Sequence, residues 1–272
     1  MHLIFPNRTA AGRLLAEKLA ARADEDGLLV LALPRGGVPV AAEVARALHA
    51  PLDVLVVRKL AAPAHPEFGL GAVASGGLQV INPRCGPVTG PTRLMIEEVA
   101  VRERLEVDRR ERTYRRGRPA PELRGRPIIL VDDGIATGST MKVAVAALHE
   151  AWAGPVTVAA PVATRESYLE LRDGVRGFVV LSMPRDFGAV GEYYEDFTPT
   201  PDAEVCRLLD EAWQNCGDVG AGPVLIGADE PNRPAGGDGA FPAGTPRGAR
   251  VRPRGALRDH GAHGLSRYRG PG

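Results

Sequence analysis

The sequence predicts an α/β protein built on a doubly wound, mainly parallel sheet of five strands that is flanked by helices. Three observations lead to this fold class. Near-continuous apolar runs of strand length recur along the chain, segments with helical spacing separate them, and turns containing glycine or proline end several of the runs. With 272 residues and 44% hydrophobic content, the chain is long enough to bury one sizeable core.

The first part of the chain predicts one βαβ unit after an opening helix. That helix covers Arg8–Arg22, with Asn7 as its N-cap. The apolar run Leu28–Leu33 is a predicted strand, Val38–Leu48 has the four-residue spacing of a helix, and Asp53–Val57 is the next strand. Because a strand, a helix and a strand follow one another so closely, we expect a right-handed crossover connection.

The second part of the chain continues the alternation and completes the sheet. Ile128–Val131 is a short buried strand, and a helix from Ser139 to about Ala151 follows it. Val156–Ala160 is the fourth strand, Thr164–Leu171 is a short helix capped by its threonine, and Phe178–Ser182 is the last strand.

Between these two parts lies an insertion, residues 59–126. The stretch "GAVASGGLQVI" predicts a hairpin with Gly76 and Gly77 at its turn. A highly charged helix at about Thr92–Arg116 follows, in which acidic and basic residues alternate at i,i+4 spacing. This spacing favours a solvated helix face, although it leaves open that one of its arginines faces a phosphate.

The chain divides into a folded domain, residues 1–216, and a tail, residues 217–272. The tail is rich in Gly, Pro and Arg and has no apolar periodicity, so it cannot bury enough surface to offset the entropy lost on ordering. We expect the tail to be disordered. Its arginines could touch RNA or acidic surfaces, but composition favours a tolerated tail.

The composition also excludes several classes of protein. The formal charge of +1 indicates neither a nucleic acid nor an acidic membrane as partner. The three cysteines, Cys85, Cys206 and Cys216, are odd in number and lack metal-ligand spacing, which argues against a disulfide framework or a zinc site and fits a reducing cytoplasm. We expect no signal peptide and no membrane span, because no apolar run approaches about 20 residues.

The strongest functional motif is "IILVDDGIATGST", Ile128–Thr140. It places Asp132 and Asp133 where a buried strand ends, and in an open parallel sheet ligands bind beyond the carboxyl ends of the strands. The residues that follow offer backbone N–H groups and hydroxyls at a helix N-terminus, which favours a phosphate. Two carboxylates beside a phosphate site make sense if they accept hydrogen bonds from a vicinal diol. The motif therefore predicts a clamp for a sugar phosphate.

This motif resembles the phosphoribosyl-pyrophosphate signature of the type I phosphoribosyltransferases. The shared features are four apolar residues, two acids, two variable positions, and then small and hydroxyl residues around a glycine. The resemblance extends from Asn7 to about Glu211 and points to a poorly characterised branch of the family. One departure is Gly134, where the family usually has an aliphatic residue, and which we expect to loosen the loop.

The resemblance implies roles for particular residues. The two acids Asp132 and Asp133 would hold the ribose hydroxyls as the catalytic pair. The 5-phosphate would be bound by Ala136, Thr137, Gly138, Ser139 and Thr140. Pyrophosphate would be bound by a loop after the first strand and by two basic residues after the second, namely Arg35, Gly36, Gly37, Arg58 and Lys59. The segment "LAAPAHPEFGLGAVASGG" corresponds to a mobile lid; His65 and Glu67 lie in it without an assigned role.

The implied reaction transfers the phosphoribosyl group to a nitrogenous base or related small-molecule acceptor and releases pyrophosphate, with Mg²⁺ as cofactor and no protein ligand that can be named. The acceptor would lie under a small hood after the last strand, where Phe187, Tyr193, Tyr194 and Phe197 could stack on a ring or could equally pack on the core. A homodimer is common among relatives. The alternative function is a non-catalytic regulator that senses the sugar donor.

Overall fold

The computed structural model describes residues 3–62, 65–81 and 90–220, and all of them belong to the first of two units, Met1–Val224. The fold class is confirmed. Five parallel strands form one sheet in the order β2-β1-β6-β7-β8. The strands are β1 (Leu29–Ala32), β2 (Leu52–Val54), β6 (Ile128–Val131), β7 (Val156–Val162) and β8 (Gly177–Ser182).

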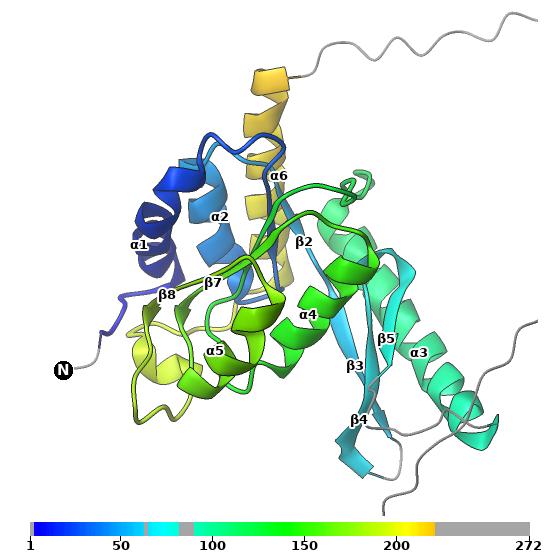
Figure 1. Ribbon diagram of the computed structural model, residues 1–272. Helices are drawn as coiled ribbons and strands as arrows, with labels where there is room; N and C mark the ends of the chain where they lie inside the picture. Colours follow the sequence, from blue (N-terminus) through cyan, green and yellow to red (C-terminus); the bar gives the residue numbers. More distant parts are fainter. Residues whose placement is uncertain (1–2, 63–64, 82–89, 221–272) are drawn as a thin grey trace, which may run out of the picture. The chain divides into compact units, whose positions relative to one another are not determined.

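Helices cover both faces of this sheet (Figure 1). On one side lie α1 (Arg8–Leu19), α2 (Gly37–Ala47) and α6 (Asp202–Gly220), and on the other lie α4 (Ser139–Glu150) and α5 (Arg165–Leu171). The two predicted N-caps are confirmed, since the Asn7 side chain accepts from the N–H of Ala10 and Thr164 accepts from the N–H of Ser167.

The core follows from the alternation of side chains along each strand. In β1, Val30 and Ala32 pack under α1 and α2, whereas Leu29 and Leu31 pack under α4. All four residues of this strand are buried, and so are all four residues of β6. Each buried Leu, Ile or Val side chain contributes roughly 1.5–3 kcal/mol. Burial on both faces explains why these strands read as continuous apolar runs.

The insertion forms a second sheet, which the sequence predicted only in part. The predicted strand Asp53–Val57 ends early at Val54 in β2, and the chain enters β3 (Val57–Ala62). Antiparallel pairing joins β3, β4 (His65–Ala74) and β5 (Leu78–Ile81). The hairpin between β4 and β5 is confirmed, and both turn glycines, Gly76 and Gly77, have a φ of 74°. Much of the segment predicted as a lid is therefore regular strand.

The long charged helix is confirmed as α3 (Gly90–Arg115), which packs against β3 and β4. Two of its predicted i,i+4 ion pairs form, Glu106–Arg110 and Glu111–Arg115. The boundary of the predicted tail needs a correction, because α6 continues four residues past 216 to Gly220. Residues 221–272, the remainder of that tail, lie outside the described residues. Within 3–62, 65–81 and 90–220, no helix combines the length and apolar character needed to cross a bilayer.

Candidate functional site

The predicted site lies where the order of strands in the sheet changes direction. From β1 the chain moves outward to β2, whereas from β6 it moves the other way to β7 and β8. The loops after β1 and β6 therefore diverge from two adjacent strands, and the N–H of Leu33 donates to the carbonyl of Val131 at 2.9 Å. Such a topological switch point is where open α/β sheets leave a crevice for ligands.

Asp133 is held by Arg8, a residue that sequence reasoning did not single out. The Arg8 Nε donates to Asp133 Oδ2 at 2.7 Å, and the two side chains are only 10% and 14% exposed. The same guanidinium donates to the carbonyl of Thr198 at 2.9 Å and lies 3.9 Å from the ring centroid of Phe197. Arg8 thus links the first helix, the acidic pair and the segment after β8. No local signal marks it, because 125 positions separate the two partners.

The two acids also lie against the glycines of the first loop. A Cβ on Gly36 would stand 2.0 Å from Asp133 Oδ2, and a Cβ on Gly37 would stand 2.8 Å from the carbonyl oxygen of Val131. Neither distance is possible for a real side chain, so a Cβ at Gly37 would collide with the backbone and a Cβ at Gly36 would displace the Asp133 carboxylate. The structure therefore brings the loop predicted to bind pyrophosphate into direct contact with the predicted ribose acids.

Asp132 and Asp133 differ in their surroundings. Burial, and then the neighbouring Asp133 carboxylate, raise the pKa of Asp132 well above its usual range. The N–H of Asp133 donates to Asp132 Oδ1 at 2.9 Å, and the hydroxyl of Tyr194 donates to the main-chain carbonyl of Asp133 at 2.6 Å. Of the two acids, Asp133 is the one that forms the ion pair with Arg8.

The predicted phosphate loop opens α4. Gly138 precedes the helix with a φ of 67°, a left-handed conformation that favours glycine. Among the described residues, the backbone N–H groups of Ala136, Thr137 and Gly138 have no acceptor. The hydroxyls of Thr137 and Ser139 lie 2.8 Å apart, and Thr140 is exposed on the first turn of the helix. The loop thus combines N–H groups, hydroxyls and the positive end of a helix dipole.

The two basic residues predicted for pyrophosphate point in different directions. Adjacent residues of a strand face opposite sides, and Arg58 and Lys59 both lie inside β3 rather than at the end of a core strand. Lys59 Nζ donates to Ser139 Oγ at 2.8 Å, which places an ammonium group at the phosphate loop. Arg58 donates to Glu103 of α3 at 2.9 Å. Lys59 therefore lies at the loop predicted to bind the 5-phosphate, and Arg58 links the second sheet to α3.

Arg35 lies in the loop that is predicted to bind pyrophosphate. The peptide bond between Pro34 and Arg35 is cis, and the Arg35 guanidinium points toward α3 and the start of α6, where its Nη1 lies 3.7 Å from Asp202 Oδ1.

The aromatic residues predicted to face the acceptor form a small core of their own. Tyr193 and Tyr194 are 3% and 6% exposed and pack with Phe5 and with the partly buried Phe187 and Phe197. The Tyr193 hydroxyl donates to the carbonyl of Asp186, and backbone bonds join Phe5 to this segment. These placements do not match an acceptor-stacking role for the two tyrosines, whose ring faces are covered by protein. The other possibility that the sequence left open, that these rings pack on the core, describes their placement.

The glycine that departs from the family pattern has a steric reason in this chain. A Cβ on Gly134 would stand 2.4 Å from Val190 Cγ1 and 3.1 Å from Val162 Cγ1. Val190 comes from the segment after β8, so the valine fills the space that an aliphatic residue at 134 would take. Gly134 therefore lets this segment pack closely, and the expected loosening of the loop is not what the structure shows.

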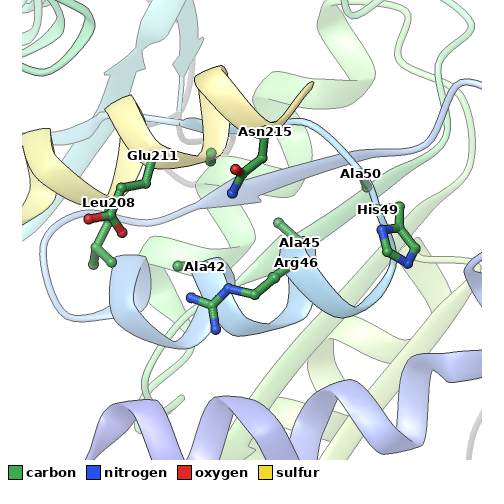
Figure 2. A pocket seen from close by; sticks show the side chains of 9 residues that line it. Ala42, Ala45, Arg46, His49, Ala50, Leu208, Glu211 and Asn215 are labelled. Carbon is green, nitrogen blue, oxygen red and sulfur yellow. The ribbon is translucent and has the colours of Figure 1, made fainter. Parts of the chain in front are cut away.

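One groove of the surface is remote from these residues. It lies between α2 and α6, where Figure 2 shows Arg46 and His49 on one side and Glu211 and Asn215 on the other. On α2 its lining runs from Ala42 to Arg46, about 8–14 Å along the helix axis from Gly37 at the start of α2. The candidate site is therefore identified by its acids, hydroxyls and backbone N–H groups and not by this groove.

Comparisons with known proteins show the family of this chain. The sequence model described as "Phosphoribosyl transferase domain" matches residues 4–196. Two proteins from strains CDC 1551 / Oshkosh and H37Rv of Mycobacterium tuberculosis, each named "Putative phosphoribosyl transferase", are 40% identical over 230 residues, which is 85% of this chain and 51% of theirs. The chain thus spans about half the length of these curated relatives.

A solved structure is similar over nearly its whole length. The crystal structure of TT1426 from Thermus thermophilus is 43% identical, with a TM-score of 0.69, and the match covers 77% of this chain and 99% of that one. The family expected from the motif after β6 is confirmed by the match over residues 4–196. The chain belongs to the phosphoribosyl transferase domain family.

Proposed function

We propose that this chain transfers the phosphoribosyl group of phosphoribosyl pyrophosphate to a nitrogenous base or a related acceptor and releases pyrophosphate. One observation carries the proposal. A pair of acids and a loop whose N–H groups have no acceptor among the described residues share one edge of the sheet, at its switch point, as the two ends of a phosphorylated ribose require.

In the proposed complex each group meets its chemical complement. The backbone and hydroxyls of Ala136–Thr140, with the Lys59 ammonium, bind the 5-phosphate through charge-assisted hydrogen bonds. Asp132 and Asp133 accept hydrogen bonds from the ribose hydroxyls. A carboxylate has about four lone-pair sites, so Asp133 can accept from a hydroxyl while it keeps its bond to Arg8. Catalysis by position and electrostatics suits a transfer in which bond breaking runs ahead of bond making.

The leaving pyrophosphate would lie over Arg35, Gly36 and Gly37. Mg²⁺ fits this site as an ion that arrives with the pyrophosphate. No group of three or more His, Cys, Asp or Glu side chains gathers to hold a metal in the described part of the chain, and magnesium keeps several waters and uses few protein ligands. The ion would supply charge neutralisation for the leaving group.

Pyrophosphate release tests the proposal. Protein, phosphoribosyl pyrophosphate and Mg²⁺ would be incubated with a panel of purines, pyrimidines and amidated small acids, and donor binding would be followed in parallel by the shift in thermal midpoint. We expect donor-dependent stabilisation and release with at least one acceptor. No binding of the donor would refute the proposal.

Donor binding without turnover on any acceptor would instead favour the regulatory alternative. One observation supports keeping that alternative: Tyr193 and Tyr194, which were expected to stack on an acceptor, are buried. The two outcomes are distinguished by the same pair of measurements, since a sensor gives the thermal shift alone.

A further inference from the structure

A polar cavity adjoins the loop predicted to bind pyrophosphate. It has a volume of about 150 Å³ and is lined by Arg35, Arg109, Arg110, Tyr114 and Asp202. Arg35 comes from the loop before α2, Asp202 is the first residue of α6, and the other three lie on the last turns of α3. We refer to these five residues as the arginine pocket. The sequence assigned a ligand to Arg35 by number and left open that an arginine of the charged helix, which carries Arg109 and Arg110, faces a phosphate.

The pocket gathers positive charge. Arg109 donates to both oxygens of Glu106, and Arg110 Nε donates to Glu106 Oε1 at 2.7 Å. These hydrogen bonds, from Arg109 first and Arg110 second, lower the pKa of Glu106 to about 2. Glu106 thus accepts hydrogen bonds from both guanidinium groups and orients them. Three arginines stand against two carboxylates, Glu106 and Asp202, so the group carries a net positive charge.

Donor groups remain available around the cavity. Arginine has five N–H donors, and Arg110 uses only its Nε within the described part of the chain. The Arg35 guanidinium donates no hydrogen bond to any of the described residues, and the Asp202 Oδ1 is 3.7 Å from its Nη1. Planar guanidinium groups with free edges match the oxygens of a phosphate, which can accept two parallel hydrogen bonds from each.

The remaining wall of the pocket consists of Tyr114 and Asp202, which are hydrogen-bonded to each other. The Tyr114 hydroxyl donates to Asp202 Oδ1 at 2.9 Å, and the tyrosine itself is only 1% exposed. Burial, and then the hydrogen bond to Asp202, raise the pKa of Tyr114 to about 12, so the phenol stays uncharged at neutral pH. Asp202, engaged by Tyr114 and close to Arg35, is the one carboxylate that lines the pocket, and it is outnumbered by the arginines.

We propose that the arginine pocket binds a phosphate group. Two sources share this chemistry: the terminal phosphate of the sugar donor's diphosphate, and a separate phosphate anion. The first source rests on the proposed function, because it needs the donor bound across the loop that holds Arg35 and Gly36. The second does not. In either case Arg109 and Arg110 extend the binding surface of the fold onto the inserted helix α3.

Titration calorimetry with inorganic diphosphate, inorganic phosphate and ribose 5-phosphate tests the proposal on the full chain. The variants are Arg109→Gln and Arg110→Gln. Arg93→Gln is the matched control, because Arg93 lies on the same helix and pairs with Glu97 at i,i+4 as Arg110 pairs with Glu106. Thermal midpoints of all variants confirm folding, and Arg110→Lys reports whether charge without the planar fork is sufficient.

We expect diphosphate and phosphate to bind the wild type and the control alike, and to bind Arg109→Gln and Arg110→Gln about tenfold or more weakly. Ribose 5-phosphate should bind all four within about twofold, since its proposed contacts, the loop before α4, Lys59 and the two acids, lie outside the arginine pocket. Phosphate titrated into protein saturated with phosphoribosyl pyrophosphate separates the sources: competition assigns the pocket to the donor's terminal phosphate, and continued arginine-dependent binding assigns it to a separate anion.

Two results would overturn the inference. Either the wild type binds neither diphosphate nor phosphate, or both arginine variants bind them as tightly as Arg93→Gln does. The proposed function fails separately. If phosphate binding depends on Arg109 and Arg110 but neither ribose 5-phosphate nor the donor binds, the pocket stands and the transferase proposal falls.

Discussion

Replacing Arg8 is the most informative perturbation of this fold, because one buried guanidinium joins α1, the acidic pair and the segment after β8. We consider Arg8→Gln, which keeps part of the side-chain volume but removes the charge. The variant would leave the Asp133 carboxylate, 14% exposed, without its cationic partner. It would also lose the hydrogen bond to Thr198 and the contact of 3.9 Å with the Phe197 ring.

The magnitude follows from these contacts. Removing one partner of a buried ion pair costs about 3–5 kcal/mol, and because neither side chain is fully buried the lower end applies. Loss of the cation–π contact adds about 1 kcal/mol. We therefore expect Arg8→Gln to lower the free energy of unfolding by about 4 kcal/mol. In the double variant with Asp133→Asn the loss should be smaller than the sum of the single losses, with a coupling of about 2–3 kcal/mol.

Urea unfolding at pH 7, followed by far-ultraviolet circular dichroism, measures these free energies. Arg13→Gln is the matched control, because Arg13 lies on the same helix and pairs with Glu43 at 3.2 Å but is 68% exposed. It should change stability by no more than about 0.5 kcal/mol. If Arg8→Gln costs less than about 1 kcal/mol, or if the double variant shows no coupling, then Arg8 does not support Asp133 and the reasoning is refuted.

Three further outcomes are expected. Gly134→Val should cost about 1–3 kcal/mol of stability through its clash with Val190, and Val190→Ala in the same chain should restore part of the loss in urea unfolding. Asp132→Asn should raise the thermal midpoint at pH 7 while abolishing donor binding. The raised pKa of Asp132 means that the native state holds a proton that the unfolded chain releases near pH 4, so wild-type stability relative to this variant should fall as pH rises above about 4. Lys59→Gln should weaken ribose 5-phosphate binding about tenfold by calorimetry, through loss of the ammonium beside Ser139, whereas Lys18→Gln, on the exposed face of α1, should leave it unchanged.

The sequence by itself determined the five strands of the parallel sheet, the helices that cover it and the positions of the loops that follow β1 and β6. Continuous apolar runs such as Ile128–Val131 signal burial on both faces of a sheet, and this property depends only on local residue order. The motif after that run also predicted where the site lies, because the carboxyl ends of parallel strands lie at one edge of the sheet. The positions of Asp132 and of the loop before α4 could therefore be expected before any contact was known.

Only the tertiary structure decided which distant side chains meet there. The partner of Asp133 is Arg8, from the other end of the domain, and no periodicity encodes a pair 125 positions apart. The separation of Arg58 from Lys59 depends on β3 belonging to a second sheet, where alternation directs one residue to α3 and the other to Ser139. Local spacing specifies elements, whereas contacts between elements depend on how their faces pack.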